Sequence, residues 1–433
     1  MRSWFWREPL YRVVLGLLLV VDYFSYLLRW VGVLKDKSNF VPGQQVQLAF
    51  LEEKNELGVD FEDTFHEEAL RNVLPGLWNW YLYGRLFPKL MIQPSLQRKR
   101  NVELRYKQRL QSGTLRKHLP LTIWIVGLPR TGSTFFHKLL ALDDRGYAAR
   151  HWELRAPVPP ASGADSRLED CRTFNKSAYS MMPKMRRIHN VEAEDPDECV
   201  MGFCDCAFPE FYLWGCRDMK PAYDWYMGST MVPQYSNYKK LLQVLCSQKD
   251  KTCSSHVVLK SPHHTAKLKT IAKIFPNSRF VWLHRPLENV VASTCSMNET
   301  LNDYTDAFYL PSQKMGERTL DRLADVMKRG LKERRELEDT KKSMPPKFTD
   351  IYYNELIADP IGTVKTLYKE CGLTVSKEFE QRLTTYLEDQ AEMRRQRRST
   401  GASHKYTLEN FGLTKEAVNH QFEEYLKVHG EGL

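Results

Sequence analysis

The sequence Leu121-Thr-Ile-Trp-Ile-Val-Gly-Leu-Pro-Arg-Thr-Gly-Ser-Thr-Phe-Phe-His-Lys-Leu-Leu140 decides the fold. Its first six residues are apolar enough for a buried strand, the next six contain two glycines and a proline, and the segment from Ser133 has helical spacing. A strand, a glycine-containing turn and a helix start together form a cradle for an anion, because free backbone N–H groups and the helix dipole point toward one place. The stretch therefore predicts binding of a phosphate or sulfate group.

The two glycines of this loop have the spacing of a Walker A motif, but the lysine of that motif is missing. Ser133 occupies its position, and the nearest cation is Arg130, inside the loop. A magnesium-dependent nucleoside triphosphatase also needs a carboxylate at a strand end, whereas the expected strand ends downstream carry Lys260 and Arg285. The sequence therefore favours a ligand rich in anionic oxygens that arginine and lysine neutralise without a metal ion.

The composition is that of a folded basic protein. The chain has 433 residues, 42% of them hydrophobic, and a formal charge of +10 at pH 7. This size allows one large domain with attachments or two domains, and the charge favours acidic partners. Nucleic acid is not expected among them, since the basic residues are scattered and no nucleic-acid-reading motif stands out. The nine cysteines lack metal-binding spacing and are expected to be small buried hydrophobic residues.

The N-terminal region is expected to contain a hydrophobic helix at residues 1–38 and a helical extension at 39–118. Residues 9–34 are mainly apolar, but Asp22 interrupts them. The pattern permits an in-plane amphipathic helix, a span with a paired polar face, or a helix buried in the protein. We expect membrane association through residues 9–34, in a Golgi or secretory-pathway type II membrane protein, with the cytoplasmic face of a membrane as the alternative.

Three further apolar segments predict the remaining strands of a catalytic domain at 119–375. The expected strands are His256–His264, Ser278–Arg285 and Phe348–Tyr353. A helix between the first two, at Thr265–Phe275, implies parallel pairing, so the expected fold class is α/β, a P-loop-like parallel sheet flanked by helices. Residues 376–433 are expected to form a basic loop and a helix that complete the site.

Several motifs together resemble those of sulfotransferases that use 3′-phosphoadenosine-5′-phosphosulfate (PAPS). The segment Pro129–Phe135 is similar to the loop that binds the 5′-phosphosulfate in that family. Arg285 and Ser293 have the spacing of the family's 3′-phosphate site. Tyr353, followed by Asn-Glu-Leu, is similar to the tyrosine that lies near the adenine.

Two further segments, Lys260–His264 and His404–Leu413, resemble the branch that groups bacterial and diverse eukaryotic members. The resemblance spans residues 120–413. It implies metal-free transfer of a sulfuryl group from PAPS to a hydroxyl or amine of a glycan, a lipid or another small acceptor. Two other functions stay open: a P-loop nucleotide kinase or triphosphatase, and a catalytically inactive membrane-bound scaffold.

The resemblance also implies the residues that bind the donor. Arg130 would contact the bridging oxygen, Phe135 would stack on the adenine, and Arg285 would hold the 3′-phosphate as a bidentate fork. Lys260 would be a further cation at the transferred group. The full set of expected donor-binding residues is Arg130, Thr131, Gly132, Ser133, Thr134, Phe135, Arg285, Ser293, Tyr353 and Lys405.

The acceptor must also lose a proton, which calls for a base. His263 and His264 precede Arg285 by the interval that separates the catalytic histidine from the 3′-phosphate arginine in cytosolic relatives, although Lys-Ser-Pro-His-His differs from their Lys-Thr-His. Glu153, in the segment His-Trp-Glu, is the second candidate. The remaining candidates are His189, Glu194 and Glu198. The expected catalytic residues are therefore His263, His264, Lys260, Arg130 and Glu153.

Overall fold

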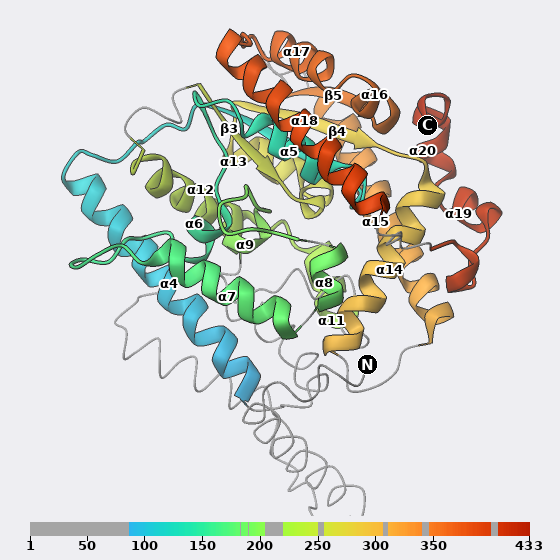
Figure 1. Ribbon diagram of the computed structural model, residues 1–433, viewed down its shortest axis with the longest axis horizontal. Coiled ribbons are helices and arrows are strands. Elements are labelled where there is room, and N and C mark those ends of the chain that lie inside the picture. The colour runs from blue at the N-terminus through green and yellow to red at the C-terminus, as the bar shows by residue number, and fades with distance from the viewer. Residues whose placement is uncertain are drawn as a thin grey trace, which may run out of the picture.

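The computed structural model describes residues 86–181, 183–188, 190–203, 220–249, 255–305, 311–339, 346–399 and 406–433. Within them lies a parallel sheet of five strands in the order β2-β3-β1-β4-β5. The strands are β1 (Leu121–Gly127), β2 (Gly146–Tyr147), β3 (His256–Lys260), β4 (Ser278–His284) and β5 (Lys347–Tyr352). This sheet and the helices around it confirm the predicted α/β fold class (Figure 1).

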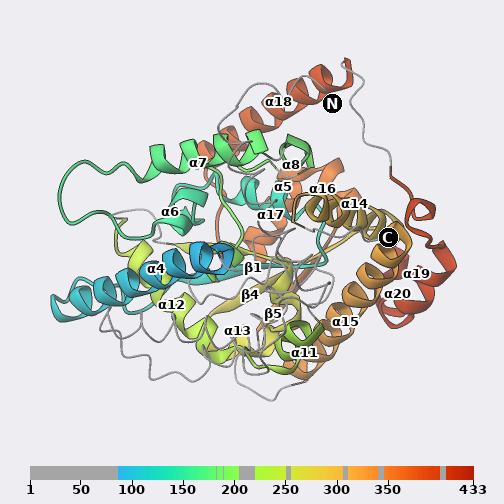
Figure 2. The same cartoon turned by 90° about the horizontal axis from the view of Figure 1, so that it is seen from below.

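Helices cover both faces of the sheet, which is the middle of three layers (Figure 2). On one face lie α12 (Val232–Cys246), α13 (Leu268–Ile274) and α15 (Ser312–Glu338), and on the other lie α5 (Ser133–Leu140), α16 (Tyr353–Ala358) and α17 (Pro360–Glu370). The other described helices are α4 (Leu86–Gln111), α6 (His151–Arg155), α7 (Arg167–Met181), α8 (Pro183–Ile188), α9 (Val200–Phe203), α11 (Lys220–Gly228), α14 (Leu287–Thr305), α18 (Lys377–Ser399), α19 (Lys415–Gln421) and α20 (Glu423–His429). Short 3₁₀ turns are η2 (Pro262–Ala266), η3 (Glu409–Phe411) and η4 (Gly430–Gly432).

Alternating side chains of the central strand β1 fill two separate cores. Trp124 and Val126 pack with the residues of α12, α13 and α15, whereas Ile123 and Ile125 pack with those of α5 and α17. All four side chains are buried, as expected for a parallel strand covered on both faces. The apolar run in the sequence is therefore the centre of the domain.

The predicted elements differ from the structure mainly at their ends. The strand expected at His256–His264 stops at Lys260, because Pro262 has no backbone N–H for a sheet and begins the turn η2. The basic segment that contains Arg394 lies in helix α18 and not in a loop. Strand β2 was not predicted, since two residues carry no periodic pattern. Residues 1–38, and 39–118 before α4, lie outside the described ranges.

The turn between β1 and α5 depends on three residues with positive φ. Gly127, Arg130 and Gly132 have φ angles of 117°, 65° and 90°. A Cβ atom at Gly127 would lie 2.6 Å from the carbonyl oxygen of Leu283 on β4, and one at Gly132 would lie 3.1 Å from the ring of Tyr353. Only glycine allows these approaches, so contacts with β4 and α16 fix the path of the loop.

Replacing Gly127 with alanine should destabilise the fold strongly. The new methyl group would overlap the Leu283 carbonyl, and the positive φ adds backbone strain, so we expect a loss of about 3–5 kcal/mol in the free energy of unfolding. Gly113→Ala is the matched control, because Gly113 also has positive φ but no atom within 4 Å of its Cβ position, and it should lose only about 1–2 kcal/mol. Urea denaturation measures both, and equal losses would contradict the role of the strand contact.

Candidate active site

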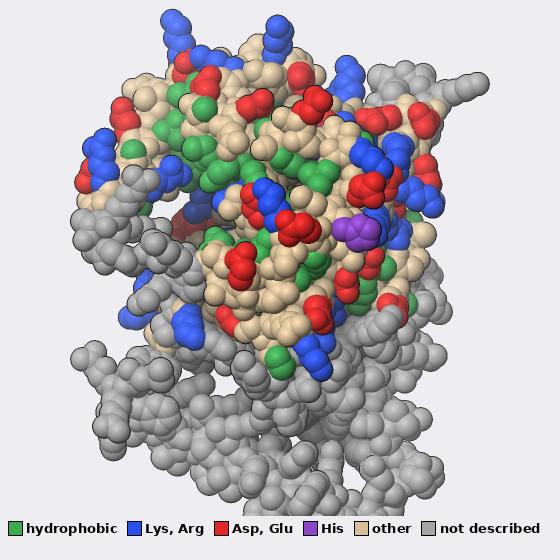
Figure 3. Space-filling model, turned by 90° about the vertical axis from the view of Figure 1, so that its right-hand side faces the viewer, with side chains coloured by type: hydrophobic (Ala, Val, Ile, Leu, Met, Phe, Trp, Pro, Cys, Tyr) green, Lys and Arg blue, Asp and Glu red, His purple; other side chains and the backbone are tan. Residues whose placement is uncertain are grey.

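The carboxyl ends of β1, β3 and β4 meet at one edge of the sheet, because the three strands are adjacent and parallel. The loop after β1, Lys260 at the end of β3 and Arg285 just after β4 therefore converge. This edge is where open α/β sheets bind ligands. On the face drawn in Figure 3 the molecule is hollowed at one side, and both basic and acidic side chains lie inside the hollow.

Two arginines and a serine are tied together beside the loop. Nη1 of Arg285 donates to the carbonyl oxygen of Arg130 at 2.7 Å, and the Arg285 guanidinium lies over the ring of Tyr353, 4.4 Å from its centroid. Nε of Arg130 donates to Oγ of Ser293 on α14 at 2.9 Å. The structure thus brings together four of the five residues that were expected at the 3′-phosphate, the adenine and the bridging oxygen; the fifth is Phe135.

Lys260 is a buried cation that faces the loop from β3. Its side chain is 2% exposed, and Nζ donates to Oε1 of Glu198 at 2.6 Å and to Oγ1 of Thr134 at 3.3 Å. The backbone N–H of Cys199 donates to the Lys260 carbonyl at 2.9 Å, which brings the neighbouring Glu198 to the strand end. Because a buried ammonium is costly without a counter-charge, Glu198 stabilises Lys260 in this position.

The hydroxyl groups of the loop have different surroundings. Thr131 is buried, and its Oγ1 donates to the carbonyl of Leu128 at 2.9 Å, so this hydroxyl holds the turn together. Helix α5 begins at Ser133 and has no acidic residue in its first turn. Its N-terminal N–H groups therefore provide a positive end toward the loop. The ring of Phe135 lies 5.7 Å from the Arg394 guanidinium on α18.

The two histidines after β3 lie in the protein interior. The Nδ1 atom of His264 pairs with the hydroxyl of Tyr235 at 2.8 Å, and its ring meets Trp124 edge-on with centroids 4.7 Å apart. Burial lowers the pKa of His264 well below its usual value. His263 is also buried, and its Nδ1 pairs with Oγ of Ser261 at 2.9 Å. The surroundings of His264 are those of a core residue.

Glu153 is surrounded by hydrogen-bond donors. It accepts from the hydroxyl of Tyr147 at 3.0 Å and from the backbone N–H of Arg150 at 2.9 Å, and it pairs with Nζ of Lys249 at 2.6 Å. The bond from Arg150 caps helix α6, and the contacts with Tyr147 and Lys249 hold the carboxylate in place, so Glu153 has a structural role. Among the other expected site residues, Glu194 pairs with Arg172 at the surface, while His189 and Lys405 lie outside the described residues.

A buried ion pair next to Glu198, between His151 and Asp197, was not predicted. Nδ1 of His151 lies 2.6 Å from Oδ2 of Asp197, and Nε2 lies 3.2 Å from Oδ1 of Asn175. The other oxygen of Asp197 accepts the backbone N–H of Glu198 at 2.7 Å. Burial lowers the pKa of His151, but hydrogen bonds with Asp197 and Cys171 outweigh it and raise the pKa to about 9. The pair therefore holds the segment that carries Glu198.

Comparisons with known proteins agree with this geometry. A model of the sulfotransferase family matches residues 120–378. The fold is similar to that of sulfotransferase STF9 from Mycobacterium avium (TM-score 0.71, 21% identity, covering 91% of this chain and 98% of that one) and of STF1 from Mycobacterium tuberculosis (TM-score 0.67, 22% identity, covering 88% and 97%). The chain therefore belongs to the sulfotransferase family, which confirms the resemblance found in the sequence.

A curated relative is the omega-hydroxy-beta-dihydromenaquinone-9 sulfotransferase Stf3 of Mycobacterium bovis, and the same protein of Mycobacterium tuberculosis matches equally well. Each is 26% identical over 275 residues, which cover 62% of this chain and 67% of the relative. These relatives are sulfotransferases, so the chain is similar to enzymes that transfer sulfuryl groups.

The expected placement in the Golgi or secretory pathway is wrong. The curated relatives and the two similar structures named above come from mycobacteria, which have no Golgi. The sequence contains two Asn-X-Ser/Thr motifs, which a secreted protein could carry glycosylated, at Asn175 and Asn298. Both asparagines are buried, and their amides donate to protein oxygens: Asn175 to Val191 at 3.0 Å and Asn298 to Thr319 at 3.1 Å. Within the described ranges no helix combines the length and apolarity needed to cross a membrane, and residues 9–34 lie outside those ranges.

The ion pair of His151 and Asp197 predicts a pH-dependent stability. His151 keeps its proton up to about pH 9 when folded but only to about 6.5 when unfolded, so its contribution is complete below 6.5 and is lost as the pH rises through 9. We expect this loss to be about 3 kcal/mol in the free energy of unfolding. Chemical denaturation at pH 6, 7.5 and 9 measures it, with Asp197→Asn as the control that should flatten the profile. Parallel profiles for the two proteins would contradict the assignment.

Proposed function

We propose that this chain transfers a sulfuryl group from PAPS to a hydroxyl or amine of a small acceptor. The observation that carries the proposal is the presence of two groups of cations at one sheet edge: Lys260 and Arg130 at the loop, and Arg285 just after β4. PAPS has phosphate groups at both its 5′ and its 3′ positions and would use both groups, whereas an ordinary nucleoside triphosphate has no 3′-phosphate. Membership of the sulfotransferase family supports the reaction class.

In this proposal the donor lies along the edge of the sheet. Arg285 and Ser293 hold the 3′-phosphate, Tyr353 and Phe135 flank the adenine, and the N–H groups of the loop bind the 5′-phosphate. The residues proposed to bind the 5′-phosphosulfate of PAPS are Arg130, Thr131, Gly132, Ser133, Thr134 and Lys260. Lys405 stays a prediction, as it lies outside the described residues.

Among the candidate general bases, Glu198 is favoured by its ion pair with Lys260. The donor's anionic oxygens would attract the Lys260 ammonium and leave the Glu198 carboxylate able to accept the acceptor's proton. The acceptor oxygen then attacks sulfur, the bond between sulfur and the 5′-phosphate oxygen breaks, and that oxygen keeps the electron pair. Lys260 and the loop stabilise the charge on this leaving group, 3′-phosphoadenosine 5′-phosphate (PAP). His263 is the alternative base.

For the acceptor, a hydroxylated lipid has the most support. The relatives are named for an omega-hydroxylated menaquinone, an apolar molecule with a hydroxyl group at its end. A glycan or another small hydroxylated molecule is the second class to test. Turnover of PAPS with a panel containing both classes would separate them.

Binding of PAP should depend on Arg285 and need no magnesium. Calorimetry in EDTA should detect PAP binding, and Arg285→Ala should weaken it by about 100-fold, because the variant loses a charged fork to the 3′-phosphate. Arg145→Ala is the control, since Arg145 bonds Asp143 beside the amino end of β2 and should leave the affinity unchanged. Magnesium-dependent binding of ATP together with no binding of PAP would contradict the proposal.

Glu198→Gln should lose turnover while it keeps PAP binding. The amide fills the same space but cannot accept the proton, so we expect kcat to fall by about 10²–10⁴-fold. His263→Asn is the matched variant and should retain most of its activity. If kcat falls in His263→Asn and is retained in Glu198→Gln, then His263 is the base and Glu198 is not. Both variants are measured for PAP affinity first, so that a change in donor binding is separated from a change in chemistry.

A further inference from the structure

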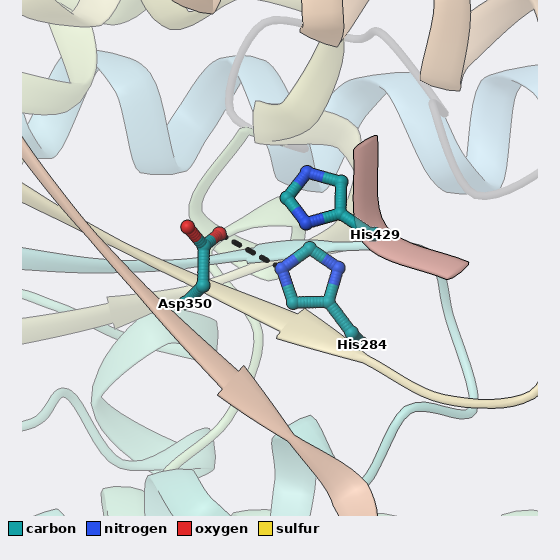
Figure 4. A group of neighbouring side chains, drawn as sticks. All are labelled: His284, Asp350 and His429. Atoms are coloured by element: carbon teal, nitrogen blue, oxygen red, sulfur yellow. Dashed lines mark hydrogen bonds and ion pairs between the residues drawn. The ribbon is translucent and has the colours of Figure 1, made fainter. Parts of the chain in front are cut away.

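A cluster of polar side chains joins the ends of β4 and β5 to the C-terminal helix α20, and Figure 4 shows three of its members, His284, Asp350 and His429. Nε2 of His284 lies 2.8 Å from Oδ1 of Asp350, and the hydroxyl of Tyr425 lies 2.8 Å from Nδ1 of His284. Arg334 on α15 donates to both oxygens of Asp350, at 2.6 and 2.8 Å. Both ring nitrogens of His284 therefore have partners.

The last residues of the described chain complete the cluster. The ring of His429 stacks on that of His284, with centroids 4.2 Å apart and an angle of 23° between the planes. Its Nδ1 lies 3.3 Å from the hydroxyl of Tyr352 at the end of β5. Gly432 lies so close to the ring of Tyr352 that a Cβ atom there would overlap it. The C-terminal segment thus packs on both strand ends.

The directions of these hydrogen bonds are fixed by charge. Burial lowers the pKa of His284, and burial also lowers the pKa of His429, to about 4. Both rings are therefore neutral at pH 7. Asp350 can only accept, because the guanidinium of Arg334 and the bond from His284 hold the pKa of this buried carboxyl well below its usual range. It follows that Tyr425 donates to His284 and that His284 donates to Asp350.

The cluster is not arranged as a metal site, although its ligand atoms lie within 4.8 Å of one another. Arg334 already binds both oxygens of Asp350 and brings a positive charge. The rings of His284 and His429 are stacked almost parallel, so their nitrogen lone pairs do not converge on one point. The arrangement suits a brace between elements better than it suits an ion.

We propose that this cluster keeps Arg285 and Tyr353, two residues of the PAPS-binding site, in their relative positions. This inference rests on the proposed function. The residue after His284 is Arg285, and the residue after Tyr352 is Tyr353. The Arg285 guanidinium lies over the Tyr353 ring at 4.4 Å, so the two strand ends must keep their relative place for this contact to exist. The C-terminal helix α20, through Tyr425 and the other contacts, holds them there.

The test is Tyr425→Phe, which removes one hydroxyl and keeps the ring. The Kd for PAP and the KM for PAPS should each rise by about tenfold, while kcat at saturating PAPS and the KM for the acceptor stay unchanged. His429→Leu, which removes the stacked ring, should also raise the Kd for PAP and the KM for PAPS.

Tyr368→Phe is the matched control. The Tyr368 hydroxyl also lies close to a buried histidine, 3.1 Å from Nε2 of His256, but this contact is at the amino end of β3. It should lower Tm without changing the Kd for PAP.

An unchanged Kd for PAP in Tyr425→Phe would overturn the inference, and so would an equal rise in Tyr368→Phe, which would indicate general destabilisation. If the wild-type protein does not bind PAP, the proposed function fails. Hydrogen exchange then tests separately whether the cluster holds the ends of β4 and β5 in place. Faster exchange of the Arg285 and Tyr353 amides in Tyr425→Phe alone would support it. Equal exchange in wild type and Tyr425→Phe would overturn it.

Discussion

Parallel pairing of β3 and β4 on the two sides of β1 is the constraint on which the rest of the structure depends. It brings the loop, Lys260 and Arg285 to one edge, although they are far apart in the sequence. Gathering cations at one place is unfavourable unless each has a partner. The protein provides one for each: a carboxylate for Lys260, a carbonyl and an aromatic ring for Arg285, and the hydroxyl of Ser293 for Arg130.

These partners differ in strength, and the difference indicates which contacts a ligand can replace. The hydroxyl and carbonyl are neutral acceptors, so an anionic oxygen competes with them easily. The bond between Glu198 and Lys260 joins two full charges in a nearly buried place, so only a strongly anionic group can take over the ammonium. The ion pair of His151 and Asp197 has no such competitor and keeps the Glu198 segment in place. The site thus combines exchangeable contacts with a fixed support.

Much of the fold could be predicted from the sequence because β1, β3 and β4 are buried on both faces and contain continuous apolar runs. Membership of the family followed from motifs that are local in the chain, such as the loop and Arg285 with Ser293. Positions that depend on tertiary contacts could not be predicted. Pro262 is a local signal for the end of the strand, but no local pattern reveals that His264, in the 3₁₀ turn that follows, enters the core.

The contact of Glu198 with Lys260 also depends on distant pairing, here the hydrogen bond from Cys199 to the strand end. The pair of His151 and Asp197 joins two segments that show no common periodicity, so the sequence offers no signal for it. Secretory placement was inferred from the composition of residues 9–34 alone, and the comparisons with mycobacterial proteins corrected it. An apolar composition indicates that a segment prefers an apolar environment, but it does not identify the compartment in which the protein is found.

The docking of α20 against the ends of β4 and β5 has a consequence for the order of events during synthesis. A ribosome makes the loop, Lys260 and Arg285 long before it makes Tyr425 and His429. The five strands of the sheet are therefore all present in the growing chain before α20 is made. Until α20 is present, the end of β4 lacks its contacts with Tyr425 and His429. The edge that carries Arg285 therefore acquires its final geometry only after α20 has been made and has docked on the strand ends.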